Sequence, residues 1–295
     1  MRYPSPLRPG ALIGETAPSS GVTAPLFPRL EAAKRHLESK GFRIREGKCL
    51  RESHKHVSAP ARDRAEEFMA MWLDPEVAAI IPPWGGELLM ELLPLLDFNR
   101  LRTAPPKWLI GYSDMSTLLF PLTLLADVAT AHGTNLMEQV SGQTAPLARD
   151  CLAPLARATG ESAGQESSAC HQTKWFKYEE EPERGFGTEG ETRWKVLGPD
   201  PGSAVRLRGR IIGGCLDTLT NLVGTPFGDL PAFRRRYASD GLILYLENCE
   251  LIPPHMARNL WQLQMAGWFE GVAGLVFGRT SAPDADSKVL SYVEA

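Results

Sequence analysis

Short apolar segments alternate with amphipathic segments through the first half of the chain, and this alternation restricts the possible folds more than any other sequence feature. The period of the apolar residues predicts strands at 11–18, 42–45, 77–81 and 108–110, and helices at 32–37, 61–73, 87–96 and 115–130. Strands that alternate with helices form a parallel sheet that is covered on both faces. We therefore expect an α/β fold built on a parallel sheet.

A change in composition after about residue 150 divides the chain. Residues 151–195 are mostly small, polar or acidic, which is typical of a linker or loop region. An apolar pattern resumes at Gly209, with helices expected at 216–222 and 256–266 and strands at 242–246 and 271–278. The length of 295 residues suits two domains. We predict an N-terminal domain over residues 1–150 and a smaller C-terminal α/β domain over residues 196–295.

The composition is that of an ordinary soluble globular protein, with 43% hydrophobic residues, 23% charged residues and a formal net charge of −3. Because no block of like charges occurs, we expect neither a nucleic-acid partner nor an anionic membrane partner. The start of the chain does not resemble a signal peptide and no long apolar run follows, which favours the cytoplasm. Neither a CxxC pair nor a His/Asp/Glu cluster with ligand spacing is present, so we predict no metal or cofactor and a small-molecule substrate.

Ser113 stands at a sharp passage from a buried strand to a helix, in the segment Gly111-Tyr112-Ser113-Asp114. Such a turn lifts the serine hydroxyl out of the sheet and leaves the backbone N–H of Asp114 at a helix N-terminus, where it can stabilise an oxyanion. This geometry suits acyl transfer. The position of the second glycine in a lipase-type turn is taken by Met115, so the pattern alone favours a residue that only caps the helix.

Gly85 and Gly86 form a second expected turn with exposed backbone N–H groups, after the strand at 77–81. Ligands of parallel sheets bind at the carboxyl ends of the strands. The N–H groups of Gly86 and Asp114 could therefore form an oxyanion hole. The alternative is a tight turn that needs glycine torsions and has no catalytic role.

Glu247 ends the apolar segment Leu242-Ile-Leu-Tyr-Leu. A carboxylate at the end of an apolar strand is costly unless it faces a cleft or has a partner. Glu247 is therefore a candidate for the acid that orients a histidine base. A strand-end cap explains the same residue equally well.

Several of these segments together resemble one family, the LD-carboxypeptidases and microcin C immunity proteins, which are serine peptidases with a Ser-Glu-His triad. The resemblance extends from about residue 10 to residue 279, nearly the whole chain. The matching segments are Thr16-Ala-Pro-Ser-Ser, Gly85-Gly86, Gly111-Tyr-Ser-Asp, His132-Gly, Gly213-Gly-Cys-Leu-Asp-Thr-Leu with Gly224-Thr-Pro, Leu246-Glu-Asn and Arg258-Asn-Leu-Trp-Gln-Leu. Their common order and spacing are more specific than any single segment.

The resemblance implies roles for individual residues and a fold. Ser113 would be the nucleophile, Glu247 the triad acid, and the N–H groups of Gly86 and Asp114 the oxyanion hole. The N-terminal nucleophile domain would contain a flavodoxin-like parallel sheet, and the C-terminal domain would close the cleft. A homodimer is the usual assembly in this family.

Two activities occur in the family. Immunity-type members cleave the amide-like link of aminoacyl or peptidyl nucleotide analogues, and LD-carboxypeptidases remove D-alanine from cell-wall tetrapeptides. Immunity-type members carry a longer loop with aromatic residues that stack on adenine, so residues 151–195 are expected to contain a substrate loop with Trp175 and Trp194 as binding residues. Docking of this loop onto the C-terminal domain is the alternative role for both tryptophans. His132 matches a family position near the cleft and is a third expected substrate contact.

The family histidine lies in a Gly-His segment after the last matched strand, whereas no histidine follows His255 in this sequence. We expect either that the sequence is truncated in its C-terminal domain or that it is a natural variant without this general base. Loss of a triad member lowers the rate by about 10⁴- to 10⁶-fold. His132 and His255 are the candidates for a substitute base. A homologue that binds and sequesters its ligand without turnover is the alternative from another functional class.

Overall fold

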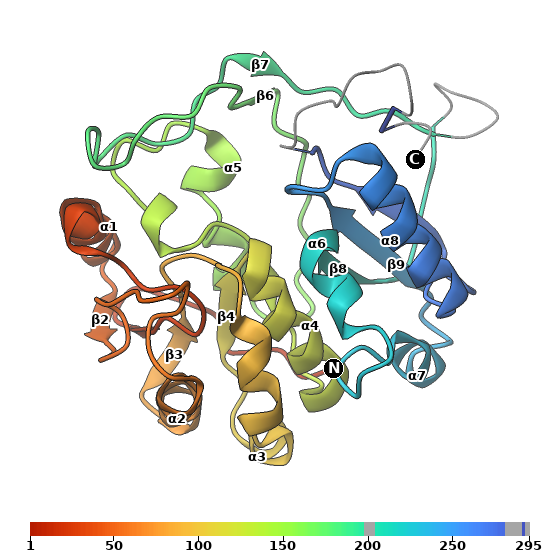
Figure 1. The fold of residues 1–295 in the computed structure, drawn as a ribbon, viewed down its shortest axis with the longest axis horizontal. Coiled ribbons are helices and arrows are strands. Elements are labelled where there is room, and N and C mark those ends of the chain that lie inside the picture. Colours follow the sequence, from red (N-terminus) through yellow and green to blue (C-terminus); the bar gives the residue numbers. More distant parts are fainter. Residues whose placement is uncertain (198–203, 281–290, 293–295) are drawn as a thin grey trace.

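The computed structural model describes residues 1–197, 204–280 and 291–292 of the chain and shows two parallel sheets side by side (Figure 1). The first sheet contains β1 (Leu12–Glu15), β2 (Arg43–Glu46), β3 (Val77–Ile80), β4 (Trp108–Gly111) and β5 (Ala131–His132). The second sheet contains β8 (Arg210–Cys215), β9 (Leu242–Glu247) and β10 (Gly274–Phe277). The helices are α1 (Phe27–Ser39), α2 (Ala61–Leu73), α3 (Phe98–Thr103), α4 (Ser116–Ala126), α5 (Pro146–Arg149), α6 (Leu216–Leu219), α7 (Leu230–Arg236) and α8 (Pro253–Met265).

The strands of the first sheet follow the order β2-β1-β3-β4-β5, and all neighbouring pairs are parallel. This is the flavodoxin-like order, in which the chain direction across the sheet reverses between β1 and β3. In such sheets ligands bind at the carboxyl ends of the strands beside the reversal. The loops that follow β1, β3 and β4 are therefore the segments expected to form a site, and the predicted parallel α/β fold is confirmed.

Apolar side chains on both faces of the first sheet hold it between layers of helices. On one face, Ile13, Ala79 and Ile110 pack with buried residues of α1. On the other face, Leu12 and Ile80 pack with α2, α3 and α4. The alternation of Leu12 and Ile13 between the two cores is the two-residue period of a strand that is buried on both faces.

Helix α4 is shared by the two sheets. It lies against β4 and β5 on one side and against β8 and α6 on the other (Figure 1). Nearly every residue of α4 is buried, and Phe120 stacks on Trp268 of the C-terminal part with 5.0 Å between the ring centroids. Stacked aromatic pairs add about 0.5–1.5 kcal/mol to the burial of their surfaces. The two sheets therefore share one continuous hydrophobic core.

Two expected helices differ from the structure, and two further helices were not predicted. The helix expected at 87–96 is only a 3₁₀ segment (Leu89–Leu95), because Pro94 has no N–H to donate to a longer helix. The helix expected at 115–130 ends at Ala126, where Asp127 adopts a left-handed φ of 58°. Helices α3 and α7 were not predicted, although each begins after an aspartate whose carboxylate accepts hydrogen bonds from the first turn.

In the linker, only two short strands form, β6 (Cys170–His171) and β7 (Gly190–Glu191), which pair in an antiparallel manner. They lie at the top of the view in Figure 1, above the space between the two sheets. Across the described ranges, none of the helices reaches the length and apolar character that crossing a membrane would require.

Glu15, the last residue of β1, is fully buried, and within the described part of the chain neither of its carboxylate oxygens has a hydrogen-bond partner. Burial raises the pKa of this carboxyl to about 8, and nearby Lys34 offsets only part of the shift. The folded protein then binds a proton that the unfolded chain has lost. The stability that this proton supplies is complete below about pH 4.5 and disappears as the pH rises to about 8.

We expect the free energy of unfolding to fall by about 3–5 kcal/mol between pH 4.5 and pH 8.5 because of Glu15 alone. In the Glu15→Gln variant, the fall should be smaller by this amount, since an amide does not titrate. Urea unfolding at both pH values measures the difference. Glu52→Gln, at an exposed position, is the control, and the same fall in wild type and Glu15→Gln would contradict the assignment.

Candidate active site

Ser113 lies one residue beyond the end of β4, after Tyr112, and begins a single 3₁₀ turn (Ser113–Met115) that leads into α4. Its backbone has a φ of 60°, a left-handed conformation that non-glycine residues rarely adopt. Such strain persists only where the surrounding structure enforces it, and it is typical of the serine in a nucleophile turn. The side chain is partly exposed, and its hydroxyl makes no hydrogen bond to another described residue.

The glycine pair lies directly against this turn. A Cβ atom on Gly85 would lie 2.8 Å from the backbone N of Asp114 and 3.2 Å from Oγ of Ser113, so only glycine allows this approach. Gly86 has a φ of 146°, and a Cβ there would lie 2.4 Å from the hydroxyl oxygens of Ser19 and Ser20. Within the described part of the chain, the N–H groups of Gly86 and Asp114 donate no hydrogen bond. Two donors therefore remain available beside the serine hydroxyl.

The buried carboxylate of Asp114 holds three segments together beneath the turn. One oxygen accepts hydrogen bonds from Oγ of Ser19 (2.6 Å) and from the backbone N–H of Leu89 (3.0 Å). The other accepts a bond from Oγ1 of Thr117 at 3.0 Å. Ser19 follows β1, Leu89 follows β3 and Asp114 follows β4, so this side chain fixes the three loops that the strand order brings together. The backbone N–H of Asp114 thus remains a donor beside Ser113, whereas its side chain holds the three loops together.

Glu247, at the end of β9, reaches across to the first sheet. Its Oε1 lies 3.1 Å from Nε2 of His132, the last residue of β5. His132 in turn is paired in register with Gly111, two residues before Ser113. The structure therefore brings together Ser113, Glu247 and His132, three of the residues singled out in the sequence, around the carboxyl end of β4.

Close contacts between small groups join the second sheet to the start of α4. Oγ of Ser116 accepts a hydrogen bond from the backbone N–H of Cys215 at 2.9 Å. A Cβ on Gly214 would lie 2.6 Å from the same Oγ, so a side chain at this position would push the sheet away from the helix. Because Cys215 is paired in register with Glu247, this junction sets the distance between the nucleophile turn and the glutamate.

A buried arginine that sequence reasoning did not identify anchors the linker beside the site. Arg29 of α1 donates hydrogen bonds to the backbone oxygens of Met137 (2.6 Å) and Arg184 (2.8 Å). Its guanidinium also lies 3.6 Å from the ring centroid of Tyr178, a cation–π contact. No sequence pattern predicts this role, because an arginine on an amphipathic helix is normally a surface residue.

Trp175 and Trp194 are exposed at 77% and 66% of their surfaces, respectively. Trp175 borders a shallow cavity of about 270 Å³ with Leu26, Phe176 and Tyr178. Trp194 does not line this cavity. The two tryptophans of the linker therefore stand in different surroundings, and only Trp175 is next to the segment that Arg29 anchors.

Glu138 is a second buried acid that the sequence did not reveal. Its Oε1 accepts a hydrogen bond from the Tyr112 hydroxyl at 3.3 Å, and its Oε2 is buried without a partner among the described residues. Burial raises the pKa of this carboxyl to about 8, despite the opposing charge of Arg29. Burial also raises the pKa of the Tyr112 hydroxyl well above its usual value. A neutral acid and a neutral phenol thus lie directly behind the nucleophile turn.

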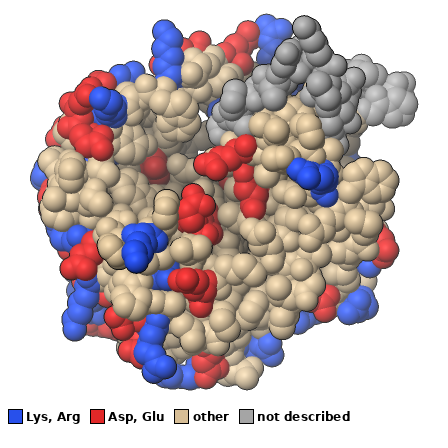
Figure 2. Space-filling model, in the orientation of Figure 1, with Lys and Arg blue, Asp and Glu red and all other residues tan. Residues whose placement is uncertain are grey.

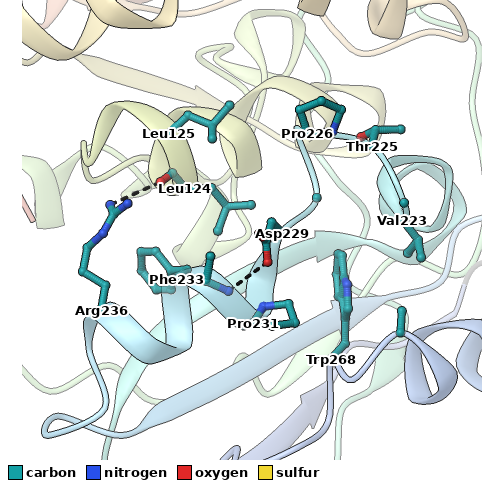
Figure 3. Close-up of a pocket in the computed structure, with 14 residues that line it drawn as sticks. Leu124, Leu125, Val223, Thr225, Pro226, Asp229, Pro231, Phe233, Arg236 and Trp268 are labelled. Atoms are coloured by element: carbon teal, nitrogen blue, oxygen red, sulfur yellow. Dashed lines mark hydrogen bonds between the residues drawn. The ribbon is translucent and has the colours of Figure 1, made fainter.

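The face that is shown in Figure 2 has acidic side chains gathered near its middle, beside a hollow in the surface. A separate cavity of about 670 Å³ lies at the far end of α4 (Figure 3). It is bordered mainly by apolar residues such as Leu124, Phe233 and Trp268. None of the site residues singled out in the sequence lines this cavity, so we place the candidate active site at the Ser113 turn.

Comparisons with known proteins match both parts of the chain. The model of the LD-carboxypeptidase N-terminal domain matches residues 13–133, and the model of the C-terminal domain matches residues 208–294. The N-terminal match contains the Ser113 turn, the glycine pair and His132, whereas the C-terminal match contains Glu247.

Three curated relatives match nearly the whole chain. A putative carboxypeptidase of Vibrio cholerae is 29% identical over 95% of this chain and 80% of that protein. A probable murein peptide carboxypeptidase of Bacillus subtilis is 27% identical over 92% and 73%, respectively. The microcin C7 self-immunity protein MccF of Escherichia coli is 26% identical over 98% and 81%.

The fold is also that of a solved protein. The structure of MccF in complex with aspartyl sulfamoyl adenosine superposes with a TM-score of 0.82. The two chains are 23% identical in sequence, and the superposition covers 100% of this chain and 85% of the other. This similarity establishes the arrangement of the two sheets.

Proposed function

Because the chain belongs to the LD-carboxypeptidase family, we propose that it is a serine hydrolase that cleaves the amide-like link of aminoacyl or peptidyl nucleotide analogues. The observation that carries the proposal is the strained Ser113 turn, with two unused N–H donors beside its hydroxyl. The relative MccF, named for self-immunity to microcin C7 and solved with aspartyl sulfamoyl adenosine, supports this substrate class. We propose further that the protein acts in the cytoplasm as a homodimer.

The proposed reaction has two steps. Oγ of Ser113 attacks the carbonyl carbon, and its proton passes to a general base that Glu247 orients. The N–H groups of Gly86 and Asp114 stabilise the negative charge on the carbonyl oxygen. The carbonyl–nitrogen bond then breaks, and the nucleotide leaves with the nitrogen, which receives the proton. Water hydrolyses the acyl-enzyme and releases the amino acid or peptide.

The buried Glu138 contributes to the site without a direct part in the reaction. As a neutral carboxyl it adds no negative charge behind the turn, where an oxyanion has to form. Asp114 accepts hydrogen bonds from three donors and uses both oxygens to hold the loops. We propose that these two acids keep the turn in place.

Removal of D-alanine from cell-wall tetrapeptides is the second candidate activity, and the similarity to a probable murein peptide carboxypeptidase favours it. Parallel assays separate the two. The purified protein is incubated with an aminoacyl-sulfamoyl adenosine and with a muramyl tetrapeptide, and released amino acid is measured. Release from the nucleotide analogue alone supports the proposal, and release of D-alanine alone contradicts it. If the protein binds the analogue and hydrolyses neither compound, it is a sequestering homologue.

Trp175 is proposed as the residue that stacks on the nucleotide base. Trp175→Ala is expected to raise KM for the nucleotide analogue by about 10- to 100-fold with little change in kcat, because base stacking contributes about 1–3 kcal/mol. Steady-state kinetics measure both constants. Trp194→Ala is the matched control, since it removes an equally exposed indole from outside the cavity. Equal increases in KM for the two variants would rule out a special role for Trp175.

A further inference from the structure

The contact between His132 and Glu247 crosses from the first sheet to the second. Nε2 of His132 lies 3.1 Å from Oε1 of Glu247, and the two side chains are 22% and 29% exposed. Both residues stand at the carboxyl ends of strands, β5 and β9. The pair therefore lies at the edge of the proposed site, where it links the strand beside the nucleophile to the proposed catalytic acid.

Neighbouring groups restrict both side chains. The ring of Tyr245 meets the His132 ring edge-on, with 5.2 Å between the centroids and 65° between the planes. Tyr245 is two residues before Glu247, so the two side chains project from the same face of β9. A Cβ on Gly278 would lie only 3.0 Å from Cβ of Glu247, which shows that the backbone after β10 packs closely against the glutamate. The imidazole and the carboxylate thus hold each other in a confined space.

The atoms that remain unpaired indicate the role of His132. Its Nε2 faces the carboxylate at 3.1 Å, so Nδ1 is the ring nitrogen that is left to accept a proton from Ser113. Nδ1 is buried and makes no hydrogen bond, to Ser113 or to any other described residue. Within the described residues, Oε2 of Glu247 also has no hydrogen-bond partner. One carboxylate oxygen is held by His132, and the other is available to a second donor.

We propose that His132 is a positioning residue that donates its Nε2–H to Oε1 of Glu247 and leaves Oε2 to orient the general base. The proposal rests on the proposed function, in which Glu247 is the catalytic acid. Its effect is geometric. A catalytic group that is displaced by about 1 Å can lower the rate by about 100-fold.

Two substitutions at position 132 separate positioning from proton transfer. His132→Phe keeps a ring beside Tyr245 but removes the donor, and it should lower kcat for the nucleotide analogue by about 10- to 100-fold with KM within about threefold. His132→Gln keeps an N–H donor for Glu247 and should retain kcat within about threefold of wild type. His54→Gln, at an exposed position, is the control. A merely structural role would not produce this split between kcat and KM or the recovery by glutamine.

Thermal unfolding gives a readout that does not depend on turnover. If the contact exists in solution, the Tm of the His132→Phe/Glu247→Gln double variant should fall by less than the sum of the two single effects. Additive changes in Tm would overturn the proposal, as would a wild-type kcat in His132→Phe. A His132→Gln variant as inactive as Ser113→Ala would instead make His132 the base. Full activity of Ser113→Ala would refute the proposed function itself. Failure of the proposed function can therefore be distinguished from failure of the proposed role of His132.

Discussion

Replacement of Ser113 by alanine is expected to lower kcat for hydrolysis of an aminoacyl-sulfamoyl adenosine by about 10⁴- to 10⁶-fold. The substitution removes the nucleophile, whereas the N–H donors of Gly86 and Asp114 remain. Because these donors and the linker stay intact, the variant should still bind the analogue. Amino-acid release measures the loss of turnover, and calorimetry measures the retained affinity. Alanine also tolerates a φ of 60° no better than serine, so the strain of the turn is unchanged.

Ser39→Ala is the matched control, because it removes an equivalent hydroxyl from an exposed position at the end of α1. It should change neither kcat nor affinity. If Ser113→Ala retained even a tenth of the wild-type rate, the covalent mechanism would be wrong. Electrophilic phosphonate probes provide an independent check, since they should label the wild-type protein at position 113 and leave the alanine variant unmodified.

Glu247→Gln is the second substitution with a large expected effect, a fall in kcat of about 10³- to 10⁴-fold. The amide keeps the size of the side chain but removes the negative charge that stabilises a protonated base. It also leaves a single acceptor oxygen, so the side chain can no longer accept from His132 and from the base at once. The loss should appear mainly in kcat, because Glu247 acts on the base and not on the bound substrate.

Glu250→Gln tests whether this loss is specific to position 247. Glu250 is exposed and only its backbone N–H is engaged, in a bond to Asp217, so its variant should keep wild-type kinetics. The Ser113→Ala/Glu247→Gln double variant should be no slower than Ser113→Ala alone, since triad members act as a unit. Independent, multiplicative losses would show that Glu247 does not belong to the catalytic group.

The architecture could be predicted because it rests on local patterns. The β3 and β4 segments are continuous apolar runs, α2 has the predicted limits of residues 61 and 73, and α8 differs from its prediction by only a few residues at its start. Segments that depend on tertiary contacts could not be predicted. Strand β5 has only two residues and exists because Gly133 donates a hydrogen bond to Gly111. No local sequence pattern predicts the pairing of β5 with β4.

The site was only partly predictable for the same reason. Turn chemistry made Ser113 and the glycine pair candidates, and the apolar strand before Glu247 made this acid a candidate. Only the resemblance to a family assigned their roles. Arg29 and Glu138 remained hidden, because the partners that bury them come from segments far apart in sequence. The contact between His132 and Glu247 spans 115 positions and two sheets, so it required the structure.

The burial of α4 between both sheets affects how the protein could be divided. A fragment that ended in the linker would retain the serine turn but would expose the side of its supporting helix that normally packs on Trp268 and β8. The boundary between the two family domains is thus not a boundary of independent folding. If the protein were split at this boundary, its two halves would first have to re-form the shared core around α4. Only then could the hydroxyl of Ser113 be held in place for a ligand.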